Sequence, residues 1–114
     1  MKLIKAYIRT YMSDKTIHAL EEIGAPRLTA IDIRALGDEV NPEHIEISSE
    51  HTGTYTEMVK LEIVAENKNV KKIVDTILKN ARTGYPGDGI IIVSKVDEVI
   101  KIRTGEPETK HESI

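Results

Sequence analysis

The sequence predicts an α+β fold with its elements in the order β-α-β-β-α-β. Three features support this prediction: stretches in which apolar and polar residues alternate, two stretches with apolar residues at helical spacing, and glycines at the boundaries between them. A chain of 114 residues is long enough for one domain with a single two-layer core. Hydrophobic residues make up 39% of the chain and charged residues 31%, a balance typical of a folded protein.

The first half of the chain predicts a strand, a helix and a second strand. Residues 3–9 (LIKAYIR) alternate as a strand does. Ser13 is a candidate N-cap for a helix that carries apolar residues at helical spacing over 17–23 and stops at Gly24. Residues 28–36 return to a period of two, with Asp32 and Arg34 on the same face of the expected strand.

The second half predicts the same succession of a strand, a helix and a strand. Residues 58–65 (MVKLEIVA) predict a third strand, and residues 70–81 form the clearest amphipathic helix. Gly84 is expected to end that helix, and the continuous apolar run 90–93 predicts a buried strand. The order is the ferredoxin-like arrangement, with two helices on one face of an antiparallel sheet. Because the strands carry apolar residues on both faces, the second face needs a cover, and we expect self-association to provide it.

Composition argues against several classes of function. The absence of Cys excludes a disulfide framework, a thiolate nucleophile and a Cys-based metal site. Four Tyr, no Phe, no Trp and a net charge of −3 argue against nucleic-acid binding. The N-terminal residues do not resemble a signal peptide, and no apolar run reaches membrane-spanning length. We therefore expect a soluble, cytoplasmic protein that does not insert into membranes.

A long acidic segment, residues 37–57, separates the second and third predicted strands. From Ala35 to Val59 there is no Lys or Arg, but there are six acidic residues, Asp38, Glu39, Glu43, Glu46, Glu50 and Glu57. The segment therefore holds more than the whole net negative charge of the chain. A solvated mobile loop and a docking surface for a basic partner are both compatible with this pattern.

Three glycines lie close together between the second helix and the last strand, Gly84, Gly87 and Gly89. Closely spaced glycines allow backbone N–H groups to converge on an anion, although they also occur in simple turns. Lys101 and Arg103 follow, and their alternation is expected to put both cations on one face. A backbone nest with two cations would suit a diphosphate.

The segment ARTGYPGDGIIIV, followed by IRTGE, resembles the C-terminal signature of the PII family of signalling proteins. MKLIKAYIR, EEIG and VKLEIV also align with that family without gaps. The resemblance implies a non-enzymatic regulator, a trimer of ferredoxin-like subunits that binds ATP or ADP in clefts between neighbours. Residues 1–106 would form the domain, 37–57 the T-loop that contacts target proteins, and 107–114 a flexible tail.

The resemblance also implies individual binding residues. The adenosine end of the cleft would be formed by Thr29, Gly37, Glu62 and Val64. The phosphates would lie on the loop formed by Gly87, Asp88 and Gly89, with two cations nearby, Lys101 and Arg103. The T-loop side chains expected to contact a partner are Glu43, His44, Glu46, Glu50, His51 and Tyr55.

Several positions depart from the family pattern. A lysine that contacts the phosphates is replaced by Ile90, and the first of two C-terminal arginines is Lys101. Glu39 replaces a glutamine and Met58 a lysine that serve 2-oxoglutarate binding, and His51 replaces a tyrosine that is uridylylated in some members. We therefore expect ADP or AMP to bind at least as well as ATP, and 2-oxoglutarate not to bind. The resemblance suggests signalling of the nitrogen-regulation type. The target would be a regulated protein, and a membrane transporter is one candidate.

Two alternatives remain open from the residues. His44 and His51, with Glu46 and Glu50, could make a metal- or small-anion-responsive module linked to a transporter, because imidazole and carboxylate suit Zn or Cu. A small phosphate-ester hydrolase could use Arg9 with Asn41, whereas the plainer interpretation makes Arg9 a surface cation at a strand end.

Overall fold

The computed structural model describes residues 1–36, 45–47 and 54–108. In this part of the chain, one antiparallel sheet has the strand order β2-β4-β1-β5, and a short strand β3 pairs with β4. The strands are β1 Lys2–Arg9, β2 Thr29–Ala35, β3 Ile45–Ile47, β4 Thr54–Ala65 and β5 Ile90–Lys95. The helices are α1 Thr10–Glu22 and α2 Val70–Ala81, and a 3-10 turn, Asn67–Asn69, precedes α2.

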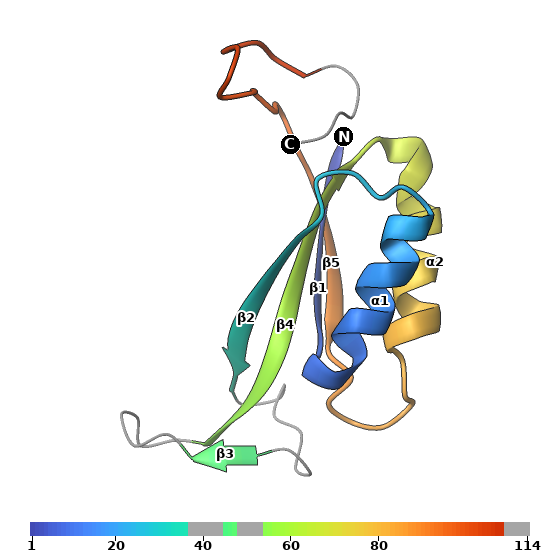
Figure 1. The fold of residues 1–114 in the computed structure, drawn as a ribbon, viewed down its shortest axis with the longest axis vertical. Helices are drawn as coiled ribbons and strands as arrows, with labels where there is room; N and C mark the ends of the chain where they lie inside the picture. Colours follow the sequence, from blue (N-terminus) through green and yellow to red (C-terminus); the bar gives the residue numbers. More distant parts are fainter. Residues whose placement is uncertain (37–44, 48–53, 109–114) are drawn as a thin grey trace.

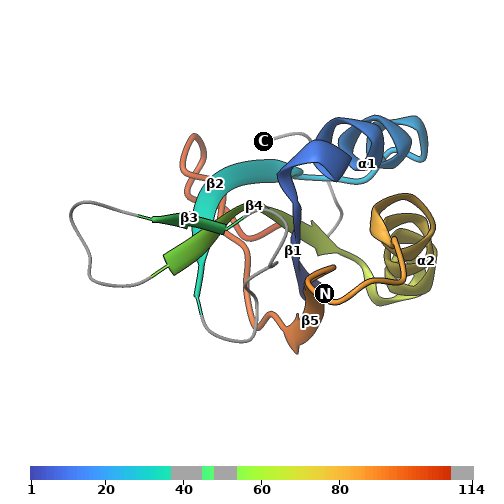
Figure 2. The same cartoon turned by 90° about the horizontal axis from the view of Figure 1, so that it is seen from below.

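Both helices cover the same face of the sheet (Figures 1 and 2). The core lies between the helices and the sheet, and its most deeply buried side chains include Ile4, Ala6, Leu20, Leu61, Ile63 and Ile77. Register explains why these residues meet, since Ile4 faces Ile63 and Ala6 faces Leu61 across the β1–β4 pair. The predicted ferredoxin-like α+β fold is confirmed.

The first helix begins earlier than the sequence predicted. β1 ends at Arg9 and α1 begins at Thr10, so the strand runs directly into the helix. Arg9 occupies the N-cap position and makes no side-chain cap hydrogen bond. Ser13 lies inside the first turn, where its Oγ donates to the Thr10 carbonyl at 2.6 Å. The assignment of Ser13 as the N-cap was therefore wrong, whereas the stop at Gly24 (φ 72°) is confirmed.

The other predicted boundaries need smaller corrections. The third predicted strand begins at Thr54 because residues 54–56 pair with β3. Part of the acidic segment is thus strand and not loop. The second helix ends at Ala81, with Arg82 already extended, so Gly84 lies in the following loop and does not end the helix. No helix in the described part of the chain is long and apolar enough to cross a membrane.

β5 is an edge strand, and in the single chain it is not buried as the sequence predicted. Ile90, Ile92 and Val93 are 46%, 42% and 44% exposed. These residues are apolar as a buried strand requires, but β5 pairs only with β1 in the described sheet and its other edge has no neighbouring strand there. Burial of these residues requires a surface that the described part of the chain does not provide.

Candidate functional site

The loop of residues 82–89, between α2 and β5, is tied to the end of β1 by Arg9. The Arg9 side chain is only 5% exposed, and its Nε donates to Asp88 Oδ1 at 3.0 Å. Its Nη2 donates to the Pro86 carbonyl at 2.8 Å and to the Tyr85 carbonyl at 3.4 Å. The interpretation of Arg9 as a surface cation was wrong because this loop folds over it.

Asp88 is the centre of the same loop. Its carboxylate accepts hydrogen bonds from the Thr83 amide at 2.9 Å, the Gly84 amide at 2.8 Å and the Thr83 hydroxyl. Burial raises the pKa of Asp88, but the Thr83 hydroxyl, the Gly84 amide, Arg9 and the Thr83 amide outweigh burial and lower the pKa from 3.8 to about 2. The carboxylate therefore stays ionised and occupies amides that the glycine pattern had suggested for an external anion.

Gly87 and Gly89 have positive φ values of 95° and 99°. A Cβ on Gly89 would lie 1.7 Å from the Tyr7 carbonyl oxygen and 3.1 Å from Met58 Cε. The loop thus packs directly against the backbone of β1 and the side chain of a β4 residue. The absence of a side chain at Gly89 is a packing requirement of this loop.

Lys101 and Arg103 lie in a turn and not in an extended segment. The Lys101 amide donates to the Glu106 carbonyl at 3.1 Å, and the Gly105 amide donates to the Lys101 carbonyl at 2.8 Å. The two cations were expected on one face because of their alternation, but the segment that carries them includes a turn over residues 102–104. Arg103 is exposed near the tip of this turn, and Lys101 is half-buried.

Residues 99–108 form a C-terminal hairpin around this turn. Ile100 and Pro107 form an antiparallel bridge, and the Glu108 amide donates to the Val99 carbonyl at 2.7 Å. Pro107 and Glu108, which were expected to belong to a flexible tail, are built into the hairpin. Residues 109–114 lie outside the described part.

The residues expected at the adenosine end lie near this hairpin. Thr29 on β2 is the register partner of Glu62 on β4. The Val64 carbonyl accepts a hydrogen bond from Arg27 Nη1 at 2.7 Å, and Arg27 also contacts Glu108 of the hairpin. The hairpin is therefore attached to the same end of the sheet as these β2 and β4 residues.

The glycine loop and the hairpin lie at opposite ends of the sheet (Figure 1). β5 connects them: Ile90 is level with Tyr7, and Lys95 is level with Lys2. The five residue steps from Ile90 to Lys95 already span about 17 Å before the hairpin begins. Within one chain, the residues predicted to bind a nucleotide thus form two separate groups.

Much of the predicted partner-binding segment lies outside the described residues. This applies to Gly37, Glu39, Asn41, Glu43, His44, Glu50 and His51. Glu46 belongs to β3, and Tyr55 is half-buried on β4 with the Arg34 guanidinium 5.0 Å from its ring centroid. Among the residues that the structure describes, no three His, Asp or Glu side chains gather as metal ligands would.

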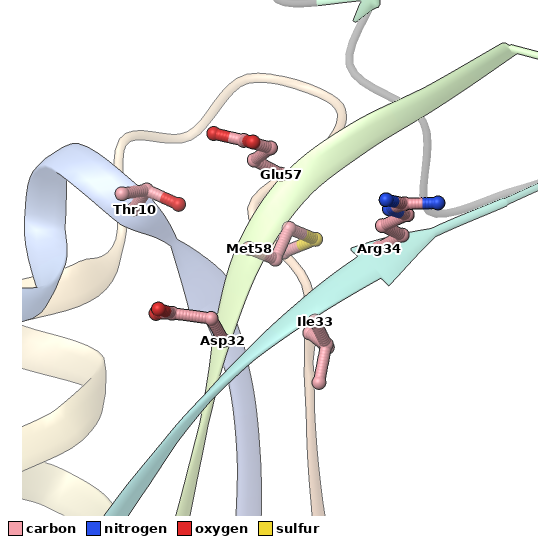
Figure 3. Close-up of a pocket in the computed structure, with 6 residues that line it drawn as sticks. All are labelled: Thr10, Asp32, Ile33, Arg34, Glu57 and Met58. Carbon is pink, nitrogen blue, oxygen red and sulfur yellow. The ribbon is translucent and has the colours of Figure 1, made fainter. Parts of the chain in front are cut away.

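A hollow of about 280 Å³ lies where β2 and β4 lead into the acidic segment. Six residues line it, Thr10, Asp32, Ile33, Arg34, Glu57 and Met58 (Figure 3). Asp32 and Glu57 lie on the side of Thr10, and Arg34 lies toward the end of β2 (Figure 3). This hollow was not predicted from the sequence, although the alternation in β2 had placed Asp32 and Arg34 on a common face.

Comparison with known proteins gives one family. The model of the family described as nitrogen regulatory protein P-II matches residues 1–106. The chain belongs to the P-II family. It is similar to the nitrogen regulatory protein P-II of Microchaete diplosiphon, at 37% identity over 110 residues that cover 96% of this chain and 98% of the relative.

Other P-II relatives show similar agreement. The protein of Synechocystis sp. is 36% identical over the same proportions of both chains. The protein of Rhizobium meliloti is 35% identical over 106 residues, which cover 93% of this chain and 95% of the relative. The family assignment made from ARTGYPGDGIIIV and IRTGE is thereby confirmed.

Proposed function

We propose that this P-II chain is a non-enzymatic signalling regulator, a homotrimer that binds adenine nucleotide between neighbouring subunits. The observation that carries the proposal is the separation of the glycine loop from the C-terminal hairpin in one chain. Two chains can place the loop of one beside the hairpin of the other, whereas one chain holds them at opposite ends of its sheet.

The uncovered apolar surface supports assembly. The helices cover one face of the sheet, while Ile31 on β2 and Ile90 and Ile92 on β5 remain between 37% and 46% exposed. Apolar residues gathered on an uncovered sheet face and edge are typical of an interface. Copies related by rotational symmetry would cover these residues and bring opposite ends of neighbouring sheets together.

The two groups of residues fit different parts of an adenine nucleotide. In the proposed cleft, one subunit contributes Thr29, Glu62 and Val64 to the adenosine, with Lys101 and Arg103 near the phosphates. The neighbour contributes the backbone of the loop at Gly87 and Gly89. Asp88 belongs to this loop through its bonds to Arg9 and Thr83, and it acts by holding the loop in shape.

The replacement of a lysine by Ile90 sets the expected ligand preference. A hydrogen bond to a charged group contributes about 1.5–3 kcal/mol, so its loss weakens the binding of terminal phosphates about ten- to a hundredfold. ADP or AMP should therefore bind at least as well as ATP. Calorimetry on wild-type protein, Arg103→Ala, Ile90→Lys and the uncharged control Ile90→Gln tests this.

Ile90→Lys should favour ATP over ADP at least tenfold more than wild type does, Ile90→Gln should not, and Arg103→Ala should lose most binding. A wild-type protein that prefers ATP tenfold over ADP contradicts the proposed preference. Failure of all three nucleotides to bind contradicts the proposed function itself.

The hollow beside Met58 supports the proposal that 2-oxoglutarate is not a second effector. Asp32 and Glu57 bring two carboxylates to its lining, and the Arg34 guanidinium is already placed over Tyr55. An incoming dianion would meet like charges, which disfavours binding. A titration with 2-oxoglutarate, with and without Mg-ATP, should give no saturable heat.

We propose that the acidic segment binds a basic surface on a regulated partner protein. A membrane transporter is one candidate for that partner. The relatives of this chain are named nitrogen regulatory protein P-II, so we propose a role for the chain in nitrogen-dependent signalling in the cytoplasm. Partner binding should weaken as salt rises, because exposed charges are screened over about 8–10 Å.

The hydrolase alternative loses its proposed cation, since Arg9 is committed to Asp88 and to the Pro86 carbonyl.

A further inference from the structure

A buried ion pair fastens the C-terminal hairpin to the body of the domain. Arg27, in the loop before β2, lies with its Nε 3.0 Å from Glu108 Oε2 and its Nη2 2.6 Å from Glu108 Oε1. The two side chains are only 7% and 4% exposed. A guanidinium that meets both oxygens of a carboxylate fixes orientation as well as distance.

Arg27 also joins a third element to this pair. Its Nη1 donates to the Val64 carbonyl at 2.7 Å, so one guanidinium links the loop before β2, the end of β4 and the base of the hairpin. Arg27 is the one non-glycine residue with positive φ (50°) in the described chain. This backbone conformation costs free energy for a residue with a Cβ, and such strain is maintained when surrounding contacts fix it.

The pair lies two residues from Thr29 and at the base of the hairpin that carries Lys101 and Arg103. From Glu108, the hairpin is closed by the bond to Val99 and the bridge between Ile100 and Pro107. The tip projects beyond the sheet (Figure 1), and Ile102 is fully exposed there. Without a fixed base, the two cations would sample many positions.

We propose that Arg27 and Glu108 form a clasp that positions Lys101 and Arg103 for the phosphates of the ligand. The nucleotide that the clasp serves rests on the proposed function, whereas the contact between Arg27 and Glu108 does not. Arg27 and Glu108 are positioning residues, since they act on the ligand through the hairpin. Apparent affinity falls in proportion to the fraction of protein in the competent conformation.

Two substitutions open the clasp by different routes. Glu108→Gln keeps the size of the side chain and removes its charge. Arg27→Gly removes the guanidinium and leaves a residue that adopts positive φ without strain, so that the loop can keep its path. Glu106→Gln is the matched control, because it makes the same chemical change at an exposed side chain of the same hairpin.

The readout is amide hydrogen exchange at Lys101, Gly105 and Glu108, together with the affinity for ADP and adenosine. Both clasp variants should exchange at least tenfold faster at these amides and bind ADP about tenfold more weakly, while adenosine binding changes less. The control should match wild type in every measurement.

Unchanged exchange in both clasp variants overturns the clasp. Faster exchange with unchanged ADP affinity overturns the positioning role while leaving the proposed function intact. A wild-type protein that binds no adenine nucleotide overturns the proposed function and the positioning role together, and exchange then still decides whether the clasp holds the hairpin.

Discussion

At the scale of single residues, the glycines of the 82–89 loop are required for different reasons, which the sequence does not distinguish. Gly84 and Gly89 both have positive φ, at 88° and 99°. A Cβ on Gly84 would meet no atom within 4 Å, whereas one on Gly89 would collide with the Tyr7 carbonyl oxygen. The requirement for glycine at 84 is conformational, and at 89 it is steric as well.

This difference predicts unequal costs for the same substitution. Gly89→Ala should lower the free energy of unfolding by about 2–5 kcal/mol, because left-handed strain of about 1–2 kcal/mol adds to a forced displacement of about 1–3 kcal/mol. Gly84→Ala should carry only the strain. Urea unfolding at one fixed protein concentration measures both, and equal losses would show that the contact with Tyr7 is relieved at little cost.

At the scale of elements, an ion pair and hydrogen bonds hold the loop between α2 and β5. Arg9 approaches from the end of β1, and the Asp88 carboxylate gathers the Thr83 and Gly84 amides. Because the pKa of Asp88 falls from 3.8 to about 2 on folding, the ionised carboxylate stabilises the folded state. That contribution is fully present above about pH 4 and is lost as pH falls through about 2.

Asp88→Asn should therefore lower the free energy of unfolding by about 2 kcal/mol at neutral pH, since one pKa unit corresponds to about 1.4 kcal/mol. The difference between variant and wild type should shrink below pH 4 and disappear below about pH 2. Asp75→Asn is the control, because Asp75 pairs with Lys71 at an exposed site and should cost less than about 1 kcal/mol. A constant difference across this pH range would mean that the charge of Asp88 does not hold the loop.

The elements that the sequence predicted best are those whose pattern reflects burial within one chain. Apolar residues at helical spacing gave α2 its observed bounds, Val70–Ala81, and alternation gave β1 to within one residue. The prediction of Ser13 as the N-cap was wrong because side-chain capping preferences do not indicate where a strand continues directly into a helix. Arg9 and Glu108 were missed because their partners, Asp88 and Arg27, are 79 and 81 residues away in the chain, and no local pattern records such pairs.

At the scale of the whole molecule, the family resemblance predicted a site between neighbouring chains, whereas the residue pattern alone named residues without a location. The motif indicated that the glycine loop and Lys101 and Arg103 serve one ligand, whereas the chain separates them along the length of β5. The exposed Ile90 and Ile92 support the same conclusion, since the described part of the chain leaves these apolar residues of β5 uncovered. The central claim is therefore that the site lies between chains.

Subunit mixing tests this claim most directly. Arg103→Ala damages the hairpin side of the site, and Gly87→Asp places a carboxylate in the glycine loop, so each variant alone should bind little ADP. Both should keep a mass of three 12.8 kDa chains by light scattering. If equal amounts are unfolded together and refolded, random assembly should pair an intact loop with an intact hairpin at about a quarter of the sites and restore that fraction of ADP binding. A mixture that assembles but binds no more ADP than the separate variants would contradict a site shared between chains.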